Sequence, residues 1–170
     1  LATLGLVLKV YIDDLTQVTR ISQMTQKTNQ FNLTTKRYAE REITALIKEE
    51  GSTVISINVQ DKYGDNGLTG LAILDNTQSI IDTLLLSCRV LGRNIEYQFM
   101  DVVVDIAKRN KLDELSAAYI KTNKNHQVVD FYEKCGFVKL NESDGDSQYS
   151  LQVNSYNNQD IQYIGVKDGR

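Results

Sequence analysis

The 170-residue sequence contains no proline, no tryptophan, two cysteines and one histidine. The absence of proline excludes proline-rich linkers and PxxP recognition segments. Cys88 and Cys135 are too few for a disulfide framework, and with one histidine they cannot supply a zinc ligand set of the usual spacing. We therefore expect two reduced thiols in a cytoplasmic protein, and no metal.

Charge and hydropathy single out neither nucleic acid nor a membrane as a partner. Lysine and arginine number 19 against 22 acidic residues, so no basic field over the whole chain favours nucleic acid. The apolar run Leu4–Ile12 is too short to span a bilayer, and it contains Lys9. With 41% hydrophobic residues the chain is expected to form one globular domain. Because it begins with leucine, we expect further sequence upstream.

Strand-like and helix-like patterns alternate along the chain. Strand patterns cover Leu6–Ile12, Val54–Val59, Leu68–Leu74, Ile80–Cys88, Leu115–Ile120, Phe137–Leu140 and Tyr149–Val153. Helical spacing follows Asp14, covers Tyr38–Glu49, continues from Ile95, and covers Gln127–Cys135. Asn66-Gly67 predicts the hairpin turn between the second and third strands. The order predicts an α/β (α+β) domain over residues 1–153, antiparallel at its start, and a polar extension over 154–170 with one further strand at Ile161–Val166.

A phosphate-binding motif separates the strand Ile80–Cys88 from the long amphipathic helix. It reads Arg-x-x-Gly-x-Asn over Arg89–Asn94. Unpaired amides at a helix N-terminus attract anions, Gly92 permits close backbone approach, and the two arginines add positive charge. Taken alone, an ordinary strand-to-helix turn is the alternative interpretation.

A second motif, Asn125–Phe137, contains the run Phe-Tyr-Glu-Lys-Cys-Gly-Phe. With the first motif in this order, the chain resembles the GNAT acyltransferases over roughly its whole length. The resemblance implies a mixed central sheet flanked by helices, whose splayed fourth and fifth strands hold the pantetheine arm of coenzyme A. It also implies that Tyr132 protonates the departing thiolate; packing on the sheet edge is the alternative role. The implied cofactor-binding residues are Cys88, Arg89, Val90, Leu91, Gly92, Arg93, Asn94 and Asn125.

Three segments, Arg20–Thr35, Tyr63–Gly67 and Ile81–Arg93, narrow the resemblance. Together they resemble the C-terminal region of the FkbH-like family, two-part proteins of methoxymalonyl-acyl-carrier-protein biosynthesis. Their N-terminal HAD-type domain takes a glyceryl unit from 1,3-bisphosphoglycerate, and its Asp-x-Asp nucleophile pair does not occur here. The resemblance implies an upstream HAD-type domain and an acyl carrier protein as partners. It also implies an acyl thioester, glyceryl in particular, on a phosphopantetheine arm.

Asn94 departs from both family patterns, which have glycine or alanine there. A side chain at this position crowds the approach of a pyrophosphate to the helix amides. Asparagine tolerates unusual dihedral angles, so we expect the turn itself to survive. We therefore expect weakened binding of coenzyme A. A carrier-bound phosphopantetheine, with a single phosphate, should suffer less.

Several polar residues are candidates for catalysis or substrate binding, each with a structural alternative. Asp82 lies mid-strand, where desolvation could raise its pKa for a general base, or it is a strand-edge acid. Cys88 could carry an acyl group beside the arginines, or be a buried structural thiol. Asn29, Gln30 and Asn32 could bind a polar acyl chain, or cap helix ends.

The sequence predicts an acyltransferase domain that handles a carrier-bound thioester, and two rival functions stay open. One is an acetyl-CoA-dependent N-acetyltransferase acting on an amine, against which Asn94 argues. The other is a non-catalytic domain that docks the carrier protein. Docking requires a basic surface around Lys27, Lys36, Arg37, Arg89 and Arg93.

Overall fold

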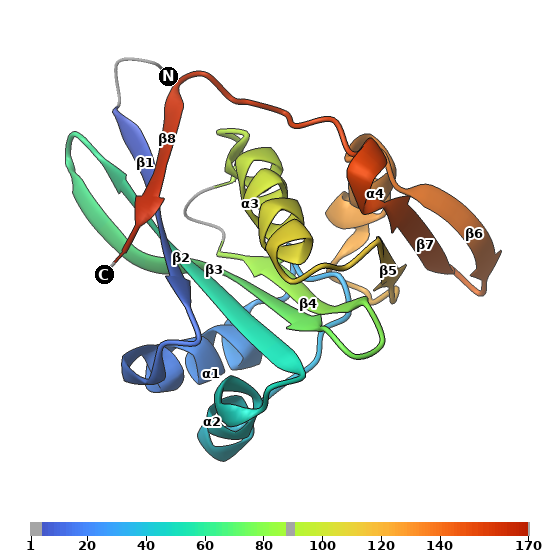
Figure 1. Ribbon diagram of the computed structural model, residues 1–170, viewed down its shortest axis with the longest axis horizontal. Helices are drawn as coiled ribbons and strands as arrows, with labels where there is room; N and C mark the ends of the chain where they lie inside the picture. The colour runs from blue at the N-terminus through green and yellow to red at the C-terminus, as the bar shows by residue number, and fades with distance from the viewer. Residues whose placement is uncertain (1–4, 88–90, 170) are drawn as a thin grey trace.

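The computed structural model describes residues 5–87 and 91–169 and contains an eight-stranded mixed sheet (Figure 1). The strands are β1 (Leu6–Ile12), β2 (Ser52–Asp61), β3 (Gly64–Asp75), β4 (Ile80–Leu86), β5 (Glu114–Tyr119), β6 (Val138–Ser143), β7 (Asp146–Gln152) and β8 (Ile164–Asp168). Their order is β6-β7-β5-β4-β3-β2-β1-β8. The first four strands pair antiparallel in sequence order, as predicted, whereas β4 with β5 and β1 with β8 are parallel.

Helices cover both faces of the sheet. The α-helices are α1 (Val18–Lys27), α2 (Glu40–Lys48), α3 (Ile95–Arg109) and α4 (Phe131–Lys134), and short 3₁₀ helices are η2 (Leu15–Gln17), η4 (His126–Val128) and η5 (Val153–Ser155). Successive strand side chains point to opposite faces. Leu85 therefore packs in the core with α1 and α2, while Leu84 and Leu86 pack with α3. This is why the triple-leucine run is buried throughout.

The hairpin between β2 and β3 turns earlier than Asn66-Gly67 predicts. The two-residue turn is Lys62-Tyr63, and Asn66-Gly67 lies inside β3. The Asp65 carboxylate accepts the Gly67 N–H (2.6 Å), Gly67 has φ 71°, and the pairing with β2 shifts register nearby. The pair thus forms an irregularity within the strand rather than its turn.

The helix predicted over Gln127–Cys135 is divided into η4 and α4. The α4 helix has only four residues and is followed by Gly136 at φ 91°, the stop that the sequence predicts. The helix predicted after Asp14 likewise begins as η2, where the Asp14 carboxylate accepts the Thr16 N–H (3.0 Å).

The C-terminal polar stretch crosses α3 and adds β8 beside β1 (Figure 1). Asp101 of α3, 4% exposed, holds this crossing with its carboxylate. It accepts hydrogen bonds from the Tyr156 hydroxyl (2.5 Å) and from the N–H groups of Gln159 (2.8 Å) and Asp160 (2.9 Å). The strand occupies Ile164–Asp168, slightly later than predicted.

Candidate functional site

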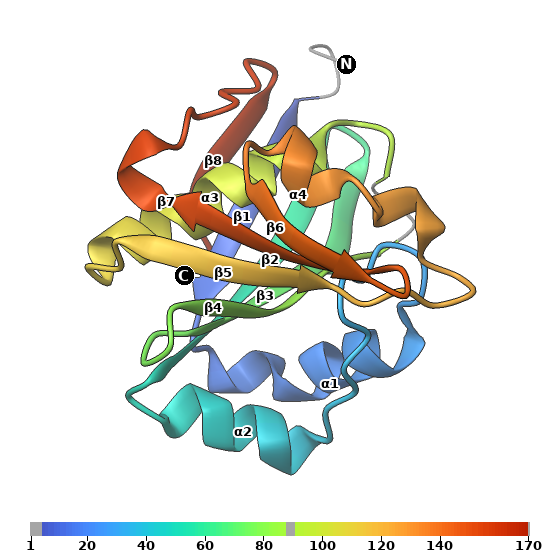
Figure 2. The same cartoon turned by 90° about the vertical axis from the view of Figure 1, so that its right-hand side faces the viewer.

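The central feature of the candidate site is a gap between the parallel strands β4 and β5. Ile80 pairs with Ser116, and this is the one residue pair that joins the two strands within the described residues. Beyond it the strands diverge toward their C-terminal ends, as the splayed arrangement predicts. Figure 2 faces this side of the molecule, with β5, β6 and β7 toward the viewer.

The turn before α3 survives with asparagine at its last position. Asn94 has φ 64°, the left-handed conformation that asparagine tolerates, and Gly92 has φ 85°. The Asn94 amide nitrogen donates to the Tyr163 hydroxyl oxygen (2.7 Å) in the C-terminal crossing. The other predicted turn residues, Cys88, Arg89 and Val90, lie outside the described residues, so their roles stay predictions.

The Arg93 guanidinium faces the end of β2. Its Nη1 lies 3.4 Å from Asp61 Oδ2, and its main-chain carbonyl accepts the Tyr163 hydroxyl (3.2 Å). This ion pair neutralises part of the positive charge that the motif would bring to a phosphate. The phosphate-binding role of Arg93 stays a prediction.

A small cavity of about 150 Å³ lies at the N-terminus of α3. Its walls come from the turn (Leu91, Gly92), from α3 (Glu96, Tyr97), from the η4–α4 segment (Gln127, Asp130, Phe131, Lys134), and from Phe31. Among the described residues, nothing lies within 4 Å of a Cβ built on Gly92. Lys134 brings a cation to the rim, where its Nζ lies 3.5 Å from Asp130 Oδ2.

Glu96 places a second carboxylate in this cavity. Burial raises its pKa, and its Oε2 atom is buried without a hydrogen-bond partner among the described residues. A carboxylate in the first turn complements the helix dipole, as a bound anion would. A highly charged anion in the cavity would therefore face two carboxylates against Lys134.

Tyr132 is 1% exposed and packs within an aromatic cluster. Its ring centroid lies 4.9 Å from that of Phe137, 5.5 Å from Tyr149 and 5.9 Å from Phe131. Burial raises the pKa of its hydroxyl, so the phenol keeps its proton at neutral pH. The structure shows the packing role, and the general-acid role stays a prediction.

Asp82 is held as a carboxylate. It accepts hydrogen bonds from Lys36 Nζ (2.6 Å), the Tyr38 hydroxyl (2.6 Å) and the Thr83 hydroxyl (2.9 Å). Burial alone would raise its pKa, but these donors outweigh burial, and the pKa is lowered. The expected rise in the pKa of Asp82 is therefore wrong. Two donors that are distant in the sequence, Lys36 and Tyr38, and the adjacent Thr83 stabilise the charged form.

No protein-family model and no curated protein matches the sequence, but solved structures match its fold. A spermidine/spermine N-acetyltransferase from Vibrio cholerae matches with a TM-score of 0.63 at 14% identity, over 88% of this chain and 95% of the other. The ribosomal-protein-S18-alanine N-acetyltransferase from Escherichia coli matches with a TM-score of 0.65 at 11% identity, over 91% of this chain and 98% of the other. Rv2747 from Mycobacterium tuberculosis, solved with CoA, matches with a TM-score of 0.62 at 11% identity, over 84% of this chain and 98% of the other. The chain has the GNAT fold.

In this GNAT fold the gap between β4 and β5 is filled by the chain itself. The segment Phe31–Thr34, which we call the plug segment, runs antiparallel to β4. Leu33 donates its N–H to the Leu84 carbonyl (3.1 Å) and accepts the Ile120 N–H (2.8 Å), so one residue bridges both sides of the gap. Leu86 donates its N–H to the Phe31 carbonyl (3.0 Å).

Asn125, predicted to bind the cofactor, is fully used inside the protein. Its amide nitrogen donates to the carbonyls of Asn32 (3.0 Å) and Ile120 (2.9 Å). Its oxygen accepts the Thr122 N–H (2.8 Å) and the Tyr119 hydroxyl (3.1 Å). An asparagine side chain offers two donors and two acceptor sites, so these contacts exhaust it. It fixes the plug segment against the end of β5.

The predicted substrate residues serve the connection between α1 and α2. Asn32 is buried, donates to the Thr28 carbonyl (3.1 Å) and accepts the Thr35 N–H (2.9 Å). Asn29 accepts a hydrogen bond from Arg37, and Gln30 is exposed. The contacts of Asn32 match the structural alternative, and substrate contact by Asn29 or Gln30 stays a prediction.

The sequence interpretation missed Tyr38 as part of this site. It named Lys36 for a docking surface and Asn32 for substrate binding, and it did not predict that residues 31–34 fill the gap. One signal was present: a carboxylate inside an apolar strand needs donors, because an unpaired buried charge is costly. The sequence cannot say which distant donors supply them. They come from the segment that precedes α2.

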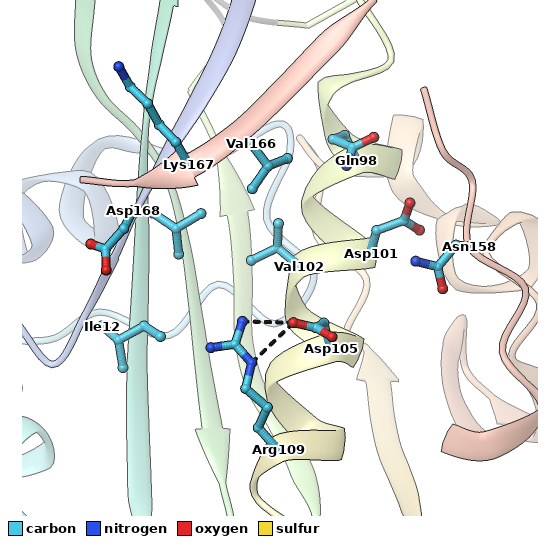
Figure 3. A pocket seen from close by; sticks show the side chains of 11 residues that line it. Ile12, Gln98, Asp101, Val102, Asp105, Arg109, Asn158, Val166, Lys167 and Asp168 are labelled. Atoms are coloured by element: carbon cyan, nitrogen blue, oxygen red, sulfur yellow. Dashed lines mark hydrogen bonds and ion pairs between the residues drawn. The ribbon is translucent and has the colours of Figure 1, made fainter. Parts of the chain in front are cut away.

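A larger cavity of about 570 Å³ lies between α3, β1 and β8 (Figure 3). Val102, Val166 and Ile12 contribute apolar walls, and Asp105 pairs with Arg109 at one end (2.7 Å). The described lining includes none of the predicted site residues. Within residues 5–87 and 91–169, no group of three or more His, Cys, Asp or Glu side chains could hold a metal ion, and no helix is long and apolar enough to cross a membrane.

Proposed function

We propose that this chain is a GNAT-type acyltransferase domain for an acyl group, glyceryl in the first instance, carried as a thioester on the phosphopantetheine arm of an acyl carrier protein. The observation that carries the proposal is the divergence of β4 and β5 toward the glycine-containing turn at the start of α3. A parallel pair that separates presents a strand edge to which an extended ligand could pair in place of the plug segment, and the helix N-terminus favours its phosphate.

The turn fits a phosphate group better than the gap fits a pantetheine arm. No described residue crowds a Cβ position at Gly92, and Lys134 supplies a cation at the rim of the cavity. Between the strands, the plug segment already pairs with β4. In this conformation the gap does not accommodate the arm.

The charges of the cavity favour the carrier-bound arm over coenzyme A. Coenzyme A brings a pyrophosphate and a further phosphate, whereas the carrier-bound arm brings one phosphodiester. Glu96 and Asp130 line the cavity and repel each added negative charge. A single phosphate meets less repulsion beside Lys134.

Two rival functions have specific support. An acetyl-CoA-dependent N-acetyltransferase is supported by the named activities of the structural neighbours. A non-catalytic docking domain is supported by the filled gap, by the ion-paired Asp82 and by the packed Tyr132. The N-acetyltransferase predicts acetyl-CoA as the ligand. The docking domain shares the carrier protein with the proposed function but binds it without need of its arm.

Isothermal titration calorimetry with three ligands separates these functions: the phosphopantetheinylated carrier, the same carrier without its arm, and acetyl-CoA. We expect binding of the carrier that requires the arm, with weaker binding of acetyl-CoA. Lys134→Ala should weaken that binding several-fold, whereas Lys48→Ala, at the exposed end of α2, should leave it unchanged. Tight acetyl-CoA binding with turnover of an amine would favour the N-acetyltransferase, and equal binding of the arm-less carrier would favour docking. Absence of binding to all three ligands would refute the proposal.

A further inference from the structure

We propose that the plug segment, Phe31–Thr34, competes with the phosphopantetheine arm for the edge of β4, so that the arm binds only after this segment leaves the gap. The inference rests on the proposed function, because it concerns access to the same site. It assigns to the connection between α1 and α2 an autoinhibitory role.

The plug segment uses the main-chain groups that an extended ligand would need. The Leu84 carbonyl accepts the Leu33 N–H, and the Leu86 N–H donates to the Phe31 carbonyl, at 3.1 and 3.0 Å. A pantetheine arm carries two amide groups and would pair with a strand edge through the same kinds of bonds. Phe31 and Leu33 are buried, so the plug segment also excludes water from the gap. The two occupants cannot share this edge.

A strained residue follows the plug segment directly. Thr35 has φ 56°, a conformation that is a genuine outlier for a β-branched residue, and its buried hydroxyl oxygen has no hydrogen-bond partner in the described structure. Such strain persists only where the surroundings enforce it, and it is typical of switch regions. Departure of the plug segment would release this strain.

Contacts on both sides of Thr35 hold the closed arrangement. Asn125 donates to the Asn32 carbonyl (3.0 Å), and Thr34 donates its hydroxyl to the Asp82 carbonyl (3.0 Å). Beyond Thr35, Lys36 and Tyr38 donate to the Asp82 carboxylate. These hydrogen bonds stabilise the closed arrangement, and the strained backbone of Thr35 destabilises it.

This arrangement predicts opposite effects of two substitutions on ligand affinity. A ligand that binds the open state alone has an apparent Kd equal to the intrinsic value divided by the open fraction. Thr35→Asn relieves strain in the closed state and should weaken binding by about fivefold. Asn125→Ala removes the hydrogen bond to the Asn32 carbonyl that stabilises the closed state, and it should tighten binding by about fivefold.

The experiment titrates phosphopantetheinylated carrier into the wild-type chain and these variants, and follows amide hydrogen exchange at Leu33 and Ile120. Both amides donate within the plugged gap, so their exchange should accelerate when the ligand binds. Lys111→Asn, at another left-handed residue (φ 62°), and Asn66→Ala, which removes a side-chain bond to the Val59 carbonyl (3.2 Å), are matched controls. Neither control should change the affinity.

Three outcomes are distinguishable. Opposite shifts in affinity with faster exchange at Leu33 support the inference. Binding with Leu33 still protected, or with an affinity unchanged by Thr35→Asn, overturns the inference and leaves the proposed function standing. Absence of binding to the wild-type chain and to both variants overturns the two together. Should Asn125→Ala fail to fold, Thr35→Asn and the exchange measurement still decide.

Discussion

The hydrogen bond between Tyr38 and Asp82 should contribute measurably to folding stability. The hydroxyl donates to the carboxylate at 2.6 Å and joins the segment before α2 to the middle of β4. The perturbation is a double-mutant cycle of Tyr38→Phe, Asp82→Ala and the double variant. Each substitution removes one partner, so the cycle isolates the interaction between the two side chains.

The structure sets the expected magnitude. A hydrogen bond to a charged acceptor stabilises by about 1.5–3 kcal/mol, so Tyr38→Phe should cost about 2 kcal/mol. The Lys36 side chain is 49% exposed, so its ion pair with Asp82 adds less than about 1 kcal/mol. The buried Thr83 hydroxyl also loses its acceptor in Asp82→Ala, so this variant should cost about 3–5 kcal/mol, with a coupling energy to Tyr38 of about 1.5–3 kcal/mol.

The coupling should depend on pH with a defined sign. Burial raises the pKa of Asp82, but the hydrogen bonds that its carboxylate accepts lower the pKa by more than burial raises it. The net pKa lies below the ordinary value of 3.8. A carboxylate with a lowered pKa in the folded state stabilises the fold at neutral pH. That contribution is lost as the pH falls below the ordinary value and through the folded pKa. The coupling measured at pH 7 should therefore shrink in strong acid.

The assay is urea unfolding followed by far-UV circular dichroism, because the chain has no tryptophan. Tyr63→Phe, at a side chain that is 78% exposed, is the matched control and should change stability little. Additive effects of Tyr38→Phe and Asp82→Ala, within about 0.5 kcal/mol, would refute the assigned interaction.

Three further changes test other parts of the structure. Gly70→Ala would place a Cβ 2.6 Å from Ile57 Cγ1, so it should destabilise the protein by about 1–3 kcal/mol in the same urea assay. Tyr156→Phe removes the hydroxyl donor to the buried Asp101 and should cost about 1.5–3 kcal/mol; a smaller loss with unchanged proteolysis of the C-terminal crossing would contradict its anchoring role. Asn94→Gly opens the turn and should tighten acetyl-CoA binding more than carrier binding in calorimetry; equal effects on both ligands would remove the crowding explanation.

The sequence determines the layers of this fold because its apolar pattern follows them. Leu84, Leu85 and Leu86 are consecutive apolar residues because β4 is covered on both faces. The apolar spacing in Ile95–Arg109 is wider than one stripe, and most of this helix is buried. The position of the β2–β3 turn was missed because the Asn66-Gly67 pair suits a hairpin turn and an irregularity within a strand equally well. The choice depends on pairing with β2, which is a tertiary contact.

The candidate site was predicted less well, since its polar residues have partners far away in the sequence. Asp82 lies 44 residues from Tyr38, and Asn125 lies 93 residues from Asn32. A mid-strand carboxylate indicates that some donor exists, but whether that donor is a substrate or the chain itself depends on the fold. In both cases the chain itself supplies a partner, so both residues anchor the connection between α1 and α2, and their predicted functional roles stay predictions.

The segment that narrowed the family resemblance is also the one that fills the gap. Arg20–Thr35 contains the plug segment, and it contains Thr28 and Asn32, whose hydrogen bond shapes the approach to it. An accidental closure would need no dedicated contacts, yet this one uses the buried amides of Asn32 and Asn125 and retains a strained Thr35. Buried polar groups with complete hydrogen bonding specify one arrangement strongly. The closed gap is therefore a specified feature of this chain, and any thioester arm that binds there must do so at the expense of these bonds.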